Sequence, residues 1–100
     1  MALNEIINRL LQVSDIYADK FNIHRDDDWF VLKIQEELGE LSAVHLKLTQ
    51  RARIGENSKV ELNKNLQDEM ADVVAMTLLF AQHRGIDIQN TIEEKWFKYL

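Results

Sequence analysis

Apolar residues recur at helical spacing through most of the chain. Across residues 3–21 they share one helix face: Leu3, Ile6, Ile7, Leu10, Leu11, Tyr17, Ala18 and Phe21. Polar and charged residues occupy the positions between them, so the pattern predicts an amphipathic helix. Residues 22–26 lack this periodicity and are predicted to form a connector.

A second helix is predicted from the aspartates at 26–28 to about Arg51. These aspartates supply an N-cap and first-turn charges that suit the helix dipole. The expected apolar seam of this helix consists of Ile34, Leu38, Leu41, His45 and Leu48. Residues 51–57 contain turn-forming residues without periodicity, so we expect a loop there.

Capping signals predict two further helices. Ser58 followed by Glu61 is the sequence pattern of a capping box, which starts a third helix. We expect that helix to run to Arg84, with Gly85 as its left-handed cap. Its apolar stripe consists of Leu62, Leu66, Val73, Met76 and Phe80. Asp87 is the predicted N-cap of a short fourth helix, on which one face carries Ile88, Ile92, Trp96 and Tyr99.

Composition strengthens the prediction of an all-α fold. The chain has 100 residues, no proline and three glycines, so little interrupts its helices. We expect a single domain spanning residues 1–100, similar to a four-helix bundle, with three long helices and a short C-terminal one. The third helix is apolar almost all round from Met70 to Ala81. Such a helix predicts burial against another subunit, in a homodimer or a dimer of dimers.

The net charge and the absence of cysteine exclude several classes of function for this chain. A net charge of -5 argues against a groove for a nucleic-acid polymer, which needs a clustered basic surface. The chain has no cysteine, which excludes disulfides and thiolate metal sites and suits a reducing compartment. Neither a signal peptide nor a membrane-spanning stretch is visible, so we expect a cytoplasmic protein without membrane association.

Two pairs of carboxylates lie beside or within the apolar stripes. Glu37 and Glu40 belong to the second helix, Glu69 and Asp72 to the third, and the spacing within each pair places both acids on one helix face. Glu69 falls near the middle of its stripe, whereas Glu37 flanks its seam. Acids clustered there without a cation would suffer desolvation and mutual repulsion. Because the ligands are all oxygens, a bound Mg²⁺, or Mn²⁺, accounts for them most simply.

The same acids also allow roles without a metal. Each acid alone could be a flank residue paired with a cation such as Lys33, and the chain could be a non-catalytic helical interaction module. A redox di-metal bundle is disfavoured, because neither Glu37 nor Glu69 is followed three residues later by histidine.

The acidic pattern resembles a known family signature. The segments Glu36-Glu37-Leu38-Gly39-Glu40 and Glu69-Met70-Ala71-Asp72 are similar to the E-E-x-x-E and E-x-x-D motifs of the MazG-like all-α nucleoside triphosphate pyrophosphohydrolases, in a short single-domain subtype. The resemblance implies Mg²⁺-dependent hydrolysis of nucleoside or deoxynucleoside triphosphates to the monophosphate and pyrophosphate, as in nucleotide-pool house-cleaning. It also implies Glu37, Glu40, Glu69 and Asp72 as metal ligands, with Glu36 assisting catalysis or orienting water.

The two motifs do not identify the residues that contact the substrate. The residues expected to contact the phosphates and the leaving pyrophosphate are Lys33, Arg51, Arg53 and Lys95. Lys33 lies nearest the acids and is also a catalytic candidate. Trp29 and Trp96 could stack on a base, although core packing is the simpler role for each, and His24 could contact the base or sugar. Relatives restricted to phosphoribosyl-ATP or deoxyuridine nucleotides share the signature, so the substrate stays open.

Overall fold

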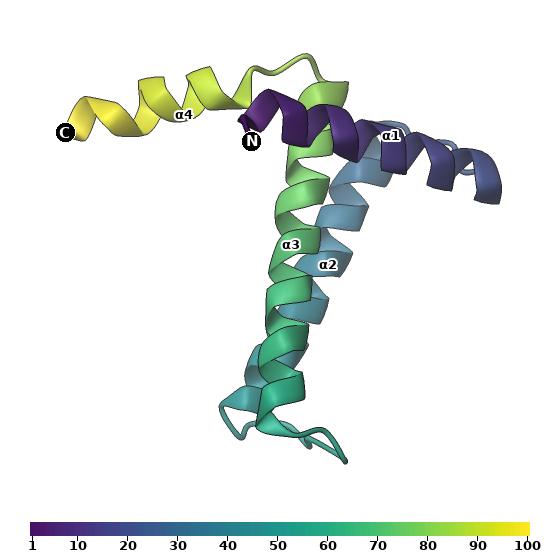
Figure 1. Cartoon of the computed structure of the whole chain (residues 1–100), viewed down its shortest axis with the longest axis vertical. Helices are drawn as coiled ribbons and strands as arrows, with labels where there is room; N and C mark the ends of the chain where they lie inside the picture. The colour runs from purple at the N-terminus through teal and green to yellow at the C-terminus, as the bar shows by residue number, and fades with distance from the viewer.

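The computed structural model describes residues 1–100 and consists of helices and their connections. The elements are α1 (Leu3–Phe21), α2 (Asp27–Leu48), α3 (Lys59–His83), α4 (Ile88–Trp96) and the 3-10 turn η1 (Phe97–Tyr99). The predicted all-α fold of three long helices and one short one is confirmed. Helices α2 and α3 form an antiparallel hairpin, α1 crosses one end of it, and α4 leaves that same end in the opposite direction (Figure 1). None of the helices combines the length and apolar character needed to cross a bilayer.

Local hydrogen bonds set the helix starts where the sequence predicts them. Asp26 and Asp87 each accept a hydrogen bond from the backbone N–H three residues on, at 2.8 and 3.1 Å. The capping box is complete, because the N–H of Glu61 donates to Ser58 Oγ at 3.1 Å and the N–H of Ser58 donates to Glu61 Oε2 at 3.3 Å. These bonds satisfy N–H groups that a helix leaves free at its start.

Helix α2 ends at Leu48, earlier than the predicted end near Arg51. Gln50 adopts a left-handed conformation with φ of 62°, and the N–H of Arg51 donates back to the carbonyl of Leu46 at 2.8 Å. Glycine or asparagine usually makes such a turn. Glutamine carries no sequence signal for it, so helical spacing alone extended the prediction too far.

Helices α2 and α3 pack along matching seams. The least exposed positions on the facing side of α2 are Phe30, Ile34, Glu37, Leu41, Val44 and Leu48, and on α3 they are Leu62, Leu66, Glu69, Val73, Met76 and Phe80. The predicted stripe of α3 is confirmed. The predicted seam of α2 is wrong by a rotation, because Leu38 and His45 are exposed and Glu37 occupies a seam position. The apolar residues of α2 allow two overlapping sets of seam positions. The observed set includes Phe30, which stacks on Phe80 with ring centroids 6.1 Å apart.

Polar side-chain contacts connect the helices near residues 25–27. Asp27, at the start of α2, lies 2.9 Å from His83 Nε2 and 2.7 Å from Arg84 Nη1, at the end of α3. Arg25, in the connector, donates to Ser14 Oγ on α1 at 2.8 Å. These contacts link α1 to the hairpin through the connector, so the orientation of α1 is constrained.

A tight turn directs α4 away from the hairpin. Gly85 has φ of 68°, its N–H donates to the carbonyl of Gln82 at 3.1 Å, and the N–H of Ile86 donates to the carbonyl of Ala81 at 2.8 Å. Asp87 is the N-cap of α4, so the connection between α3 and α4 is short. None of the residues of α4 is buried, and only α1, α2 and α3 form the core of the single chain.

Substituting Gly85 tests this turn. Gly85→Ala should lower the free energy of unfolding by roughly 1–2 kcal/mol, because a Cβ at a left-handed position is strained even in open space. Gly39→Ala is the matched control: it lies within α2, where an added Cβ meets nothing, and should stabilise by about 0.5–1 kcal/mol. Thermal unfolding followed by circular dichroism measures both. Equal effects of the two variants would contradict the assigned role of the turn.

Candidate metal centre

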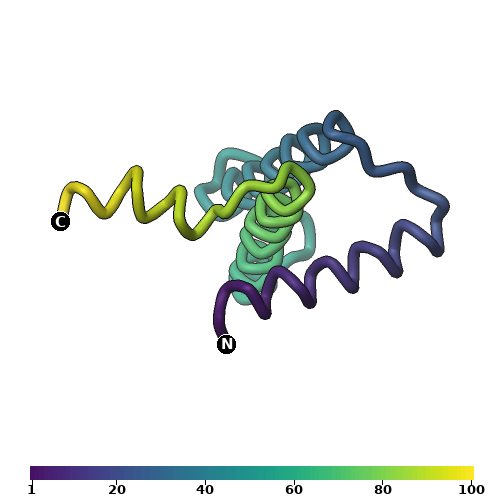
Figure 2. The backbone as a smooth tube through the Cα atoms, turned by 90° about the horizontal axis from the view of Figure 1, so that it is seen from above, coloured from purple at the N-terminus to yellow at the C-terminus, as the bar shows by residue number.

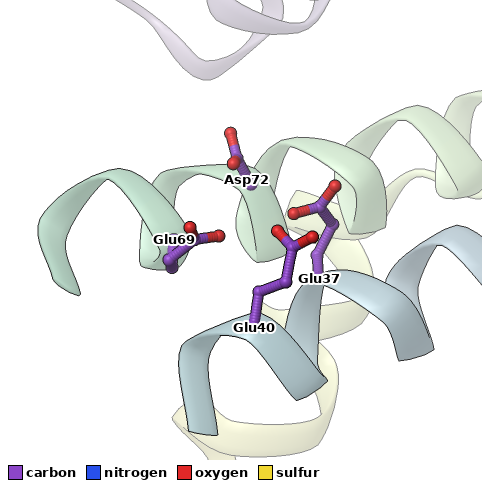
Figure 3. Close-up of side chains that lie close together, drawn as sticks. All are labelled: Glu37, Glu40, Glu69 and Asp72. Atoms are coloured by element: carbon purple, nitrogen blue, oxygen red, sulfur yellow. The ribbon is translucent and has the colours of Figure 1, made fainter. Parts of the chain in front are cut away.

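Four carboxylates converge at the middle of the α2–α3 hairpin. Glu37 and Glu40 extend from α2 toward Glu69 and Asp72 on α3 (Figure 3). One carboxylate oxygen from each lies within 4.8 Å of those of the other three. The i,i+3 spacing places each pair on one helix face, and the antiparallel register of the seams places the two pairs opposite each other. The group could therefore hold a metal ion.

The two inner acids have unsatisfied oxygens. Glu37 Oε2 and Glu69 Oε2 are inaccessible to solvent and have no hydrogen-bond partner. Glu40 and Asp72 lie on the exposed side of the cluster. None of the four carboxylates forms a salt bridge with lysine, arginine or histidine. A buried acceptor without a partner is costly, so this arrangement lacks a positive charge that a cation would supply.

Burial and mutual repulsion shift the titration of the inner acids. Burial, followed by the neighbouring Glu40, Asp72 and Glu69 carboxylates, raises the pKa of Glu37 from 4.5 to about 7. The pKa of Glu69 is also raised, first by burial and then by Glu40 and Asp72. An oxygen-only set of this kind fits a hard divalent cation, which would displace the protons held by the inner carboxyls.

An apolar cavity of about 370 Å³ adjoins the acids. It lies between α1, α2 and α3 and is lined by Leu10, Val13, Ser14, Tyr17, Trp29, Lys33, Glu37, Asp72, Ala75, Met76 and Leu79. Seven of these eleven residues are hydrophobic, whereas Lys33, Glu37 and Asp72 bring charge to the wall. The cavity therefore offers an apolar surface next to the candidate metal ligands.

The contribution of α1 to this cavity was not predicted from the sequence. Val13 lies outside the predicted apolar stripe of this helix, and its side chain is 65% exposed even though it borders the cavity. An apolar residue outside the stripe of an amphipathic helix was the available signal. The sequence does not show where α1 crosses the hairpin, so this signal could not link Val13 to the four acids.

Lys33 lies at the cavity wall together with Glu37 and Asp72. Its Nζ donates to Glu36 Oε1 and Oε2 at 3.3 and 3.4 Å and lies 6.0 Å from the ring centroid of Trp29. Trp29 is half-buried and lines the same cavity. Glu36 lies outside the four-acid cluster, so its direct contact is with the lysine.

The remaining candidates lie elsewhere in the single chain. His24, expected near the pocket, lines a separate polar depression with Asp26, Asp27, Asp28 and His83. Arg51 and Arg53 lie, as expected, on the loop between α2 and α3, which is at the end of the hairpin away from α1 (Figure 1). Lys95 and Trp96 are on α4, which the Gly85 turn directs away from the acids.

Comparison of the chain with models of protein families, with curated proteins and with solved structures found no match in any of the three.

The raised pKa values predict how metal-free stability varies with pH. Because the folded-state pKa of Glu37 lies above its unfolded value of 4.5, its contribution is fully present below pH 4.5 and is lost as pH rises toward about 7. The shift of Glu69 acts in the same direction. With a chelator present, the Tm should thus fall between pH 5 and pH 8, and millimolar Mg²⁺ should restore it at pH 8. Glu37→Gln should flatten the pH dependence, whereas an unchanged slope would argue against the shift.

Proposed function

We propose that this chain is a MazG-like nucleoside triphosphate pyrophosphohydrolase that requires Mg²⁺ and releases the monophosphate and pyrophosphate. The observation that carries the proposal is the pair of buried, unpartnered oxygens of Glu37 and Glu69 within a cluster of four carboxylates. The resemblance of the two motifs supplies the reaction. A cytoplasmic role in clearing unwanted nucleotides would follow.

The four clustered acids would hold the metal. Bound there, Mg²⁺ or Mn²⁺ supplies Lewis-acid activation of phosphate oxygens and of an attacking water. Glu37 and Glu69 must give up the protons that burial favours before they can act as ligands, so binding should strengthen as pH rises. Glu40 and Asp72, on the exposed side, would face the triphosphate.

Lys33 and Glu36 would act beside the cluster. The ammonium of Lys33 reaches the cavity wall that Glu37 and Asp72 share. There it would offset the negative charge that develops on the leaving pyrophosphate. Glu36 accepts both bonds from Lys33 and would hold the ammonium in place. Glu36 would therefore assist through the lysine.

The apolar cavity would receive the nucleoside. Its acidic wall fits the metal-bound phosphates, and the aromatic rings of Tyr17 and Trp29 offer stacking surfaces for a base. The distant candidates Arg51, Arg53, Lys95, Trp96 and His24 would reach this cavity only from another subunit. A homodimer or a dimer of dimers is part of the proposal.

Glu69→Gln tests the metal cluster. The substitution preserves size and should preserve the helical fold, but it should lower Mg²⁺-dependent pyrophosphate release by about 100-fold or more, because a ligand charge is lost. Asp68→Asn is the matched control: it removes an exposed charge that pairs with Lys64 at 2.8 Å, and it should retain full turnover. Turnover is followed with a panel of common and modified triphosphates, deoxyuridine triphosphate and phosphoribosyl-ATP.

Two outcomes would reject this assignment. Full turnover by Glu69→Gln would remove Glu69 from the ligand set. Absence of hydrolysis across the panel by the folded wild type, together with stabilisation by Glu69→Leu, would favour the interaction module.

Tyr17→Ala tests the cavity. Losing an aromatic stacking surface should raise KM roughly tenfold while changing kcat much less, because the lost contact is with the bound base. Phe21→Ala is the control, since Phe21 packs against Tyr17 with ring centroids 4.7 Å apart but does not line the cavity. Steady-state kinetics of pyrophosphate release measures both variants. A KM that responds equally to the two would place the base elsewhere.

A further inference from the structure

Ser14 differs from the other hydroxyl-bearing helical residues of the chain. A serine or threonine within a helix can donate its O–H to the backbone carbonyl four residues earlier. The other serines and threonines that follow a helical turn all form this bond, at 2.7 to 3.0 Å: Ser42, Thr49, Thr77 and Thr91. Ser14 Oγ instead accepts a hydrogen bond from Arg25 Nη1 at 2.8 Å. A guanidinium has no acceptor, so the O–H of Ser14 remains available to another partner.

This hydroxyl lies between the cavity and a second, smaller depression. Ser14 lines the apolar cavity of about 370 Å³ and also a depression of about 240 Å³, whereas Arg25 lines only the depression. The guanidinium therefore approaches Ser14 from outside the cavity. Because the O–H points away from the N–H that Ser14 accepts, it can serve a molecule inside the cavity (Figure 2 shows α1 beside the hairpin).

Arg25 holds Ser14 as a hydrogen-bond donor. The guanidinium is anchored a second time, because its Nη2 lies 2.9 Å from Asp15 Oδ1, and the Arg25 side chain is only 25% exposed. A hydrogen bond from a charged donor is stronger than one between neutral groups, and it polarises the O–H of the hydroxyl that accepts it. Ser14 thus presents a strengthened donor on a wall that is otherwise mostly apolar.

The position of Ser14 fits the edge of a base that lies far from the sugar. The four acids belong to α2 and α3, so the phosphates of a bound nucleotide would stay at that side of the cavity. Ser14 lies on α1 three residues before Tyr17, and both line the cavity. Residues three apart are neighbours on a helix surface. A base that stacks on Tyr17 would therefore bring its outer edge, with its exocyclic group, close to Ser14.

We infer that Ser14 donates a hydrogen bond to a carbonyl oxygen of the base, so that the site favours bases with a carbonyl over bases with an amino group at that edge. This inference rests on the proposed nucleotide hydrolysis and names its substrate class. Uracil, thymine, guanine and hypoxanthine offer the carbonyl, whereas cytosine and adenine present an amino donor. Two donors that face each other leave both unpaired, which is unfavourable. Arg25 is a positioning residue, because it acts through Ser14.

Two matched pairs of substrates test the role of Ser14. Deoxyuridine and deoxyinosine triphosphates carry the carbonyl where deoxycytidine and deoxyadenosine triphosphates carry the amino group. The wild type should hydrolyse the carbonyl member of each pair with a kcat/KM roughly tenfold higher or more. Ser14→Ala should lower this value roughly tenfold for the carbonyl members and change it little for the amino members. Ser42→Ala is the matched control and should retain the preference, since Ser42 donates to the carbonyl of Leu38 and does not line the cavity.

Arg25→Met tests the positioning role. Without the guanidinium, Ser14 should turn its O–H to the carbonyl of Leu10, as the other helical hydroxyls do, and the preference should disappear. A loss of stability alone would lower turnover of both members of a pair equally, so the ratio within each pair is the readout. Asp15→Asn is the control, because it removes the charge beside Arg25 but retains an acceptor oxygen, and it should keep the preference.

The outcomes separate this inference from the proposed function. Equal use of both members of a pair by the wild type, a preference for the amino members, or a preference that survives Ser14→Ala or is lost in Ser42→Ala would overturn the role of Ser14 and leave the hydrolase standing. A preference that survives Arg25→Met would overturn the role of Arg25. A folded wild type that hydrolyses none of the four triphosphates would reject the proposed function, and this inference with it.

Discussion

The packing of α2 against α3 holds four carboxylates within 4.8 Å of one another, and much else in the molecule follows from that constraint. Glu37 and Glu69 occupy the centres of the two seams, where an apolar residue would pack more favourably. Apolar contacts along the seams, such as the Phe30–Phe80 stack, hold the helices together despite this repulsion. The hairpin thus keeps a cluster of four carboxyl groups without a cation of its own, which a divalent cation would stabilise.

The site has two sides with different environments. On the solvent side, Glu40 and Asp72 are exposed and the cavity under α1 begins. Toward the seam, the inner oxygens of Glu37 and Glu69 are shielded from water, which raises the pKa of both carboxyls. This asymmetry suits a bound metal, because ligands shielded from water hold the ion while exposed ones leave room for a substrate.

The single chain has an extended shape, with a radius of gyration of 16.0 Å. A hairpin with acids at the centre of both seams contributes less apolar burial than a fully apolar pair of helices. Helix α1 covers one side and forms the cavity, while the segment from Ile88 onward covers none of the hairpin.

Local sequence patterns determined the helix boundaries that depend on nearest neighbours. Asp26, Ser58 with Glu61, Gly85 and Asp87 act within one turn of the chain, so their effects could be predicted from the sequence. The i,i+3 spacing likewise determined that the acids of each pair share a helix face. The ending at Gln50 could not be predicted, because its left-handed conformation has no signal in the residue type.

Only the tertiary structure decided which faces meet. The seam of α2 contains Glu37 and not Leu38, because packing against α3 selects one of two overlapping apolar registers, and periodicity alone cannot rank them. The way α1 crosses the hairpin places Tyr17 and Asp72, which are 55 residues apart in the sequence, in the same cavity. The turn before α4 directs the helix that contains Trp96 away from this cavity. Contacts between distant segments depend on how helices cross, which the one-dimensional pattern does not encode.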